Sequence, residues 1–181
     1  QGYSSAASDV YKRQKLDKIK CLRRKIMREE LKDVKRISIV GGPGTGKTTL
    51  AQRLSNILKI PATHLDSVNF KPNWEKIPTE ERDNIILEKS KEEYWIIDGN
   101  YVGTLGERLE RADLVIWLDY STINIIKGVL ERTIRNFNKE KKELPGCKER
   151  IDWHFLKYMI TFRTKKRRKI EENINKIAKE K

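Results

Sequence analysis

The sequence predicts an α/β fold in which a parallel β-sheet is covered by helices on both faces. Four short apolar runs have the length and composition of buried strands, at 37–40, 62–65, 94–98 and 114–119. Segments with helical spacing separate these runs, and strands that alternate with helices are typical of a parallel sheet. A glycine-rich loop joins the first run to the first helix, as in folds that place ligands at the carboxyl ends of their strands.

The first half of the chain supplies two strands and two helices. After the first strand, residues 48–58 carry leucine and isoleucine on one helical face, and Pro61 ends that helix. The second strand follows at 62–65. An aromatic, turn-rich segment at 70–74 then leads to Thr79-Glu80-Glu81-Arg82, which has the composition of a helix start, and the helix is expected to run to about Lys91.

The second half alternates in the same way. The strand at 94–98 and the strand at 114–119 flank a short helix expected at 103–111. A longer helix is predicted at 122–136, followed by a polar run and a turn at Pro145-Gly146. The apolar segment 152–162 is expected to pack, and the basic tail beyond it keeps helical spacing through its isoleucines.

The glycine-rich loop fits the pattern G-x-x-x-x-G-K-[ST] and predicts a phosphate-binding site. Its glycines permit backbone conformations that turn N–H groups inward, and the following helix N-terminus favours anions. Lys47 is expected to reach the β- and γ-phosphates of ATP and Thr48 to ligate Mg²⁺. The expected nucleotide-binding residues are Gly41, Gly42, Pro43, Gly44, Thr45, Gly46, Lys47, Thr48 and Thr49.

Three acidic residues are placed at the ends of apolar strands, where their side chains can meet. Asp98 follows Trp95-Ile96-Ile97 and is expected to hold Mg²⁺ directly or through water. Asp66 is expected to orient a phosphate acceptor and take its proton. Asp119 has the weakest pattern of the three. For each, the structural alternative is a turn acid or a helix cap.

Arginines on a mobile lid are expected to neutralise the charge that develops during phosphoryl transfer. Arg132 and Arg135 share a face of the helix that leads into a lid at about 136–150, and Lys148 and Arg150 form a second basic set there. The alternative is a solvated helix face in a lysine-rich protein.

Three further side chains near the predicted site have two interpretations each. Trp74 and Tyr101 lie in loops beside the acidic strand ends, where they can stack on an acceptor ring or pack in the core. His64 can contact substrate or form a hydrogen bond at a strand end. Neither His64 nor His154 has the spacing of metal ligands.

Charge and cysteine content limit the class of protein. The formal net charge is +14, but residues 1–26 and 163–181 contribute +6 each, which leaves +2 for the body. Two isolated cysteines provide no disulfide framework or zinc motif, and no apolar run is long enough to cross a bilayer. A cytoplasmic protein without membrane insertion is expected. The sequence leaves its oligomeric state open.

Both ends of the chain have unusual features. Ser4–Gln14 matches the translation of a transposase sequencing adapter, so residues 1–26 are interpreted as an artefactual extension and Met27 as a plausible start. At the other end, a fifth strand is expected but does not occur. The predicted organisation is one domain at 27–181 that is truncated at its C-terminus.

Several motifs together resemble the "DNA topology modulation protein" family (FlaR-related), which consists of small P-loop NTPases similar to adenylate kinase. They are the P-loop, His64-Leu65-Asp66, Pro72-Asn73-Trp74, the run from Trp95 to Tyr101, Ala112-Asp113 and Gly146-Cys147-Lys148-Glu149. The resemblance implies a three-layer fold with strand order 2-3-1-4-5, binding of Mg-ATP and transfer of a phosphoryl group to a small molecule. The last strand of that order is the one missing here.

The leading hypothesis from the sequence is an ATP-dependent small-molecule kinase whose acceptor is not identified. The alternative is a nucleic-acid-associated ATPase or regulator of DNA topology, based on the basic segment Arg163–Lys169. A nucleotide-binding module without catalysis remains a third hypothesis.

Overall fold

The computed structural model describes residues 26–136, 140–141, 144–148 and 153–180. The chain divides into two compact units, residues 1–34 and residues 35–181. In the described part of the first unit, residues 26–30 are helical, and the Leu31 N–H donates to the Met27 carbonyl. The adapter-like segment 4–14, and all of the predicted extension except Ile26, lie outside the described residues.

The second unit is built on a parallel sheet of four strands. These are β1 (Arg36–Gly41), β2 (Ala62–His64), β3 (Trp95–Asp98) and β4 (Leu114–Leu118). Their order is β2-β3-β1-β4, with β1 in the centre, where Ile37 is paired with Ile96 on one side and Leu114 on the other. The α/β class and the first four positions of the expected strand order are thus confirmed. Parallel strands need a crossover connection that returns the chain to the same end of the sheet, and the intervening helices provide these connections.

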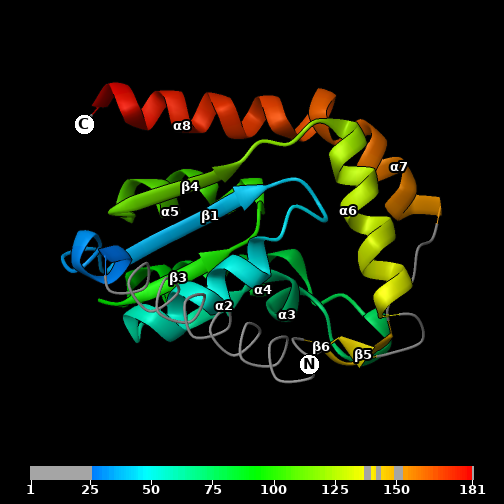
Figure 1. The fold of residues 1–181 in the computed structure, drawn as a ribbon, viewed down its shortest axis with the longest axis horizontal. Coiled ribbons are helices and arrows are strands. Elements are labelled where there is room, and N and C mark those ends of the chain that lie inside the picture. The colour runs from blue at the N-terminus through cyan, green and yellow to red at the C-terminus, as the bar shows by residue number, and fades with distance from the viewer. Residues whose placement is uncertain (1–25, 137–139, 142–143, 149–152, 181) are drawn as a thin grey trace, which may run out of the picture. The chain divides into compact units, whose positions relative to one another are not determined.

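Helices cover both faces of this sheet. Helix α2 (Lys47–Leu58) contacts β1, β2 and β3, and buries Ala51 and Leu54. Helix α4 (Thr79–Lys91) and helix α5 (Leu105–Arg111) contact each other and the sheet, and α5 also contacts α8 (Arg168–Glu180), which runs beside it (Figure 1). Side chains alternate across each strand, so neighbouring residues of β1 face different helices.

The remaining helical segments complete the second unit. Short helices α3 (Leu65–Asn69), η1 (Pro72–Trp74) and η2 (Val102–Thr104) lie in the connections. Helices α6 (Thr122–Arg135) and α7 (Trp153–Thr161) contact each other and lie at the end toward which β1 points (Figure 1). A π-helical turn, η3 (Phe162–Arg167), joins α7 to α8. Within the described residues, none of the helices combines the length and apolarity that a bilayer crossing requires.

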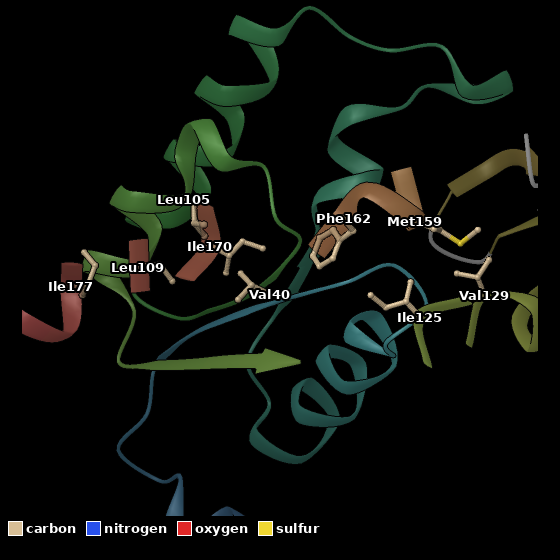
Figure 2. Close-up of a cluster of buried hydrophobic side chains, with 9 residues drawn as sticks. All are labelled: Val40, Leu105, Leu109, Ile125, Val129, Met159, Phe162, Ile170 and Ile177. Atoms are coloured by element: carbon tan, nitrogen blue, oxygen red, sulfur yellow. The ribbon is translucent and has the colours of Figure 1, made fainter. Parts of the chain in front are cut away.

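The main core forms where α5, α6, α7 and α8 meet the central strand. Figure 2 shows the nine buried residues of this core. Val40 of β1 lies between the side chains from α5 and α8 and those from α6 and α7. The spacing that predicted a helix in the basic tail is confirmed, since Ile170 and Ile177 are buried on one face of α8. The nine residues are Val40, Leu105, Leu109, Ile125, Val129, Met159, Phe162, Ile170 and Ile177.

Two short antiparallel strands, β5 (Glu140–Lys141) and β6 (Leu144–Lys148), lie within the predicted lid. The sequence predicted a turn at Pro145-Gly146, but both residues are in β6. A two-stranded ribbon tolerates this pair because an edge strand can lack the proline N–H. A Cβ on Gly146 would lie 2.9 Å from Pro72 Cβ, so β6 packs directly on η1. The other lid residues, 137–139, 142–143 and 149–150, lie outside the described residues.

Candidate active site

The glycine-rich loop between β1 and α2 forms a backbone cradle. Gly44 and Gly46 have φ values of 70° and 87°, in the left-handed region that favours glycine. Gly46 is the N-cap of α2, and no side chain caps that helix terminus. The N–H groups of the first turn of a twelve-residue helix therefore face the cradle, where they can bind an anion.

Helix α6 supports the cradle through a contact between two glycines. A Cβ on Gly128 would lie 2.4 Å from the Gly44 carbonyl oxygen, and a Cβ on Gly44 would lie 2.7 Å from the Val129 nitrogen. The loop backbone and the helix backbone therefore touch, which leaves no room for a side chain on either residue. This contact brings the following turn of α6, with Arg132, toward the loop.

Lys47 lies among charged groups from several elements. Its ammonium donates to the Gly42 carbonyl at 2.7 Å, which also accepts a hydrogen bond from the Thr45 hydroxyl at 2.8 Å. Burial lowers the pKa of Lys47, the nearby carboxylates of Asp66 and Asp98 oppose that fall, and the positive charge of Arg132 adds to it. The charges of three other predicted site residues therefore act on the Lys47 ammonium. These residues are Asp66, Asp98 and Arg132.

Asp98 lies at the end of β3 with 4% of its surface exposed. One carboxylate oxygen is 3.0 Å from His64 Nδ1, so His64 forms a hydrogen bond at the end of β2, which was one of its two interpretations. The other oxygen, Oδ2, is buried and has no hydrogen-bond partner among the described groups. A buried carboxylate oxygen without a partner fits a site for a cation or its water ligand.

The predicted placement of Asp66 at a strand end is wrong in detail, because β2 ends at His64. Asp66 lies in the first turn of α3, where a carboxylate is favoured by the helix dipole. The Tyr101 hydroxyl donates to its Oδ1 at 3.1 Å. Burial raises the pKa of Tyr101, and the neighbouring Asp66 carboxylate raises it further, so the phenol keeps its proton and remains a donor.

Tyr101 is itself held by an arginine on α4. The Arg82 guanidinium carbon lies 4.9 Å from the centroid of the Tyr101 ring. Arg82 also donates to Asp83 through Nε and Nη2, at 2.9 and 2.7 Å. Tyr101 is therefore fixed by a stacked cation and a hydrogen bond rather than left free in its loop.

The two predicted lid arginines are in different environments. Arg132 is half-buried, lies 5.9 Å from the centroid of the Phe155 ring and is close enough to Lys47 to lower its pKa. Arg135 is exposed in the last turn of α6. The side chain of Lys148 is not described, and Arg150 lies outside the described residues.

The remaining residues of the sequence prediction lie in α2 and η1. Thr48 is half-buried and Thr49 exposed in the first turn of α2. Trp74 packs edge-to-face against Phe70 with ring centroids 5.3 Å apart. Both Asn73 and Trp74 have positive φ values, a conformation that is strained for residues other than glycine.

Asp119 and part of the basic segment bind each other. Arg167 donates to the Asp119 carboxylate, with its closest contact at 2.7 Å, and Arg163 lies 3.7 Å from the same group. Arg167 also pairs with Glu171 at 2.8 Å. Asp119 is therefore a partner of basic side chains rather than the turn acid or helix cap that the sequence offered as its structural alternative, since Ser121 caps α6. Lys165 and Lys166 remain exposed.

Sequence analysis missed three residues that shape the site. Gly128 was visible as an isolated glycine inside a helix, which often marks a close contact. Asn100 contacts the cradle, and Arg108 is fully buried below the β3–α5 loop. Asn100 lies in the run from Trp95 to Tyr101 that carries the family resemblance, but no role was assigned to it. No sequence pattern distinguished Arg108, whose partners are backbone carbonyls.

Comparisons with known proteins agree with the observed fold. No protein-family model and no curated sequence matches the chain. Solved structures do match, among them "Shikimate kinase from Acinetobacter baumannii in complex with shikimate", with 16% sequence identity and a TM-score of 0.50. That match covers 78% of this chain and 83% of the shikimate kinase chain.

At this identity the likeness concerns the fold, and the specific DNA topology modulation family is not confirmed. The chain has an α/β fold with a parallel sheet covered by helices, similar to the fold of shikimate kinase.

Proposed function

We propose that this chain is an ATP-dependent kinase that transfers the γ-phosphoryl group to a small molecule. The observation that carries the proposal is the convergence of Asp66, Asp98 and Arg132 around the P-loop lysine. Phosphoryl transfer needs a basic group that binds the phosphates and a second cation that stabilises the transferred group. It also needs one carboxylate for the metal ion and one for the acceptor hydroxyl. Similarity to the fold of a kinase supports it.

In this proposal the cradle holds the triphosphate. The N–H groups at the start of α2 bind the β-phosphate, and Lys47 exchanges its contact with the Gly42 carbonyl for phosphate oxygens. Burial lowers the pKa of Lys47, and the negative charge of a bound phosphate would oppose that fall, as the carboxylates of Asp66 and Asp98 already do.

Thr48 and Asp98 are the residues that would hold Mg²⁺. Hydroxyl and carboxylate oxygens are hard ligands, and the buried Asp98 Oδ2 without a partner is suited to a bound cation or its water. Among the described residues, no three acidic, histidine or cysteine side chains gather as a metal centre, so nucleotide and water oxygens would complete the coordination. A Mg²⁺ ion held there would neutralise part of the negative charge of the phosphates.

Asp66 is the proposed acceptor carboxylate. It accepts a hydrogen bond from an acceptor hydroxyl, orients that oxygen toward the γ-phosphorus and takes its proton as the new O–P bond forms. The bond from the γ-phosphorus to the bridging oxygen breaks, and ADP leaves. Arg132 stabilises the charge on the transferred group, with Arg135 as a lid arginine beyond it.

The test is ADP release from Mg-ATP in the presence of a panel of nucleosides, nucleoside monophosphates, sugars and shikimate. One class of compound is expected to stimulate release strongly. Lys47→Ala is expected to lower the stimulated rate by about 100-fold, because it removes a cation from the transferring phosphates. A panel without stimulation, combined with tight Mg-ATP binding, would contradict the kinase and favour a nucleotide-dependent regulator.

A further inference from the structure

The side-chain amide of Asn100 forms two hydrogen bonds with the backbone of the first P-loop glycine. The Gly41 N–H donates to Asn100 Oδ1 at 3.0 Å, and Asn100 Nδ2 donates to the Gly41 carbonyl at 2.8 Å. The orientation of the amide follows from its partners, since a backbone N–H can only donate and a carbonyl can only accept.

These two hydrogen bonds extend the β1–β3 ladder by means of a side chain. The last backbone bond of that ladder runs from the Gly99 N–H to the Ile39 carbonyl at 3.0 Å. Gly41 is two residues farther along β1, so its polar groups point to the same side, where β3 has already ended. Gly41 is buried, and its N–H and carbonyl would lose these partners without the Asn100 amide.

Arg108 fixes the loop from which Asn100 projects. It is fully buried, and its guanidinium donates to the carbonyls of Gly99 at 3.2 Å and Asn100 at 3.0 Å. Burial lowers the pKa of Arg108 to about 10, although nearby Asp83 and Asp98 oppose that fall. A buried guanidinium that holds two successive carbonyls leaves the backbone at residue 100 little freedom.

We infer that Asn100 is a positioning residue for nucleotide binding. Its amide holds the backbone of Gly41 and thereby fixes the start of the phosphate-binding loop. Arg108 in turn fixes the backbone of Asn100. The inference rests on the proposed nucleotide site and adds a residue outside the P-loop motif. Asn100 also forms a side-chain hydrogen bond with Tyr158, but its two hydrogen bonds to Gly41 act on the first glycine of the phosphate-binding loop.

The test compares the full chain with Asn100→Ala and Asn100→Leu in two measurements. Calorimetric titration with Mg-ADP is expected to show affinity weakened by about tenfold, the effect of losing hydrogen bonds to a buried backbone. Amide exchange followed by NMR, without nucleotide, is expected to be about tenfold or more faster at Gly41 and unchanged at Ile97 in β3.

Ile86→Val is the matched control, because Ile86 is fully buried in α4 and the change lowers stability without touching the cradle. It should reduce the melting temperature and leave Mg-ADP affinity within twofold. Asn100 variants that bind Mg-ADP like the unaltered chain, or that exchange Gly41 no faster, would overturn the inference. If the unaltered chain does not bind Mg-ADP, the proposed function fails, and the exchange at Gly41 still decides whether Asn100 holds the loop.

Discussion

Lys47 and Asp66 contribute opposite charges to the same site, and each is held by a neighbour. Lys47 is bound to the Gly42 carbonyl, and Asp66 to the Tyr101 hydroxyl. The Lys47 contact lies in the cradle proposed for the nucleotide, whereas the Asp66 contact lies on the side proposed for the phosphate acceptor. Substitutions at the residue scale should therefore separate nucleotide binding from acceptor turnover.

Tyr101→Phe is expected to lower acceptor-stimulated ADP release roughly tenfold and leave Mg-ADP affinity unchanged. The variant removes the donor at 3.1 Å from Asp66 but keeps a ring for Arg82 to stack on, and hydrogen bonds to charged groups contribute about 1.5–3 kcal/mol. Steady-state kinetics and calorimetry check the two parts. Tyr94→Phe is the control, since Tyr94 is exposed. A parallel loss of nucleotide affinity would show that Tyr101 does not act through Asp66.

At the scale of elements, the contact between α6 and the P-loop depends on Gly128. Its absent side chain lets the helix backbone approach the Gly44 carbonyl, a rigid neighbour that cannot move aside as a flexible side chain can. The helix therefore sets the position of the loop and carries Arg132 toward it.

Gly128→Ala is expected to destabilise the protein by about 1–3 kcal/mol and to weaken Mg-ADP binding, because its Cβ would lie 2.4 Å from a backbone oxygen. Thermal unfolding and calorimetric titration measure the two effects. Gly106→Ala in α5 is the matched control. Its Cβ would lie 3.4 Å from Asn173 Oδ1, an ordinary contact, so helix propensity should make that variant neutral or slightly more stable. Equal behaviour of the two variants would refute the α6 contact.

The starts of β1 and β4 are joined by a carboxylate. Asp113 accepts hydrogen bonds from the backbone N–H groups of Lys35 and Arg36, and its other oxygen is 2.7 Å from Arg36 Nη2. The hydrogen bond from the Arg36 side chain is the main reason that the pKa of Asp113 lies below its ordinary value. The contact therefore links the two strands at the end opposite the P-loop.

The lowered pKa gives a pH-dependent contribution to stability. A carboxyl whose pKa is lower in the folded state stabilises the protein above its ordinary pKa and loses that contribution as the pH falls through the folded value. Asp113→Asn should cost about 1 kcal/mol at neutral pH, a modest amount because the pair is partly exposed. Urea unfolding at pH 7 and near pH 3 measures this, and the deficit should shrink at the lower pH. A constant deficit would contradict the assigned pairing.

At the scale of the whole molecule, the sequence predicted the sheet and its helices, while the site residues stay a prediction whose members the structure brings near one another. Apolar runs mark buried strands, and the rule that ligands bind at their carboxyl ends placed Lys47 and Asp98 together. The end of β2 was misplaced because Leu65 is buried and apolar whether it belongs to a strand or to a helix. Periodicity cannot separate the two over so short a run.

Long-range contacts through backbone groups were not predictable in the same way. Asn100 binds Gly41 across 59 positions, and Gly128 touches Gly44 with no side chain at all. Arg108 is a charged residue in a short helix, for which exposure is the usual outcome, yet it is fully buried. Carbonyls of the adjacent loop accept hydrogen bonds from its two terminal nitrogens, whereas its Nε has no partner among the described groups. Asn100 and Gly128 contact the backbone of the phosphate-binding loop, and Arg108 fixes the backbone of Asn100. Only the structure revealed these contacts.

The most direct test of the central claim follows the labelled γ-phosphoryl group of Mg-ATP once the panel has identified a stimulating acceptor. If the chain is a kinase, the label moves to the acceptor in a one-to-one ratio with ADP, and Asp66→Asn lowers that transfer by about 100-fold while Mg-ADP affinity stays the same. Label that appears in inorganic phosphate at the same rate with and without the acceptor would contradict the claim.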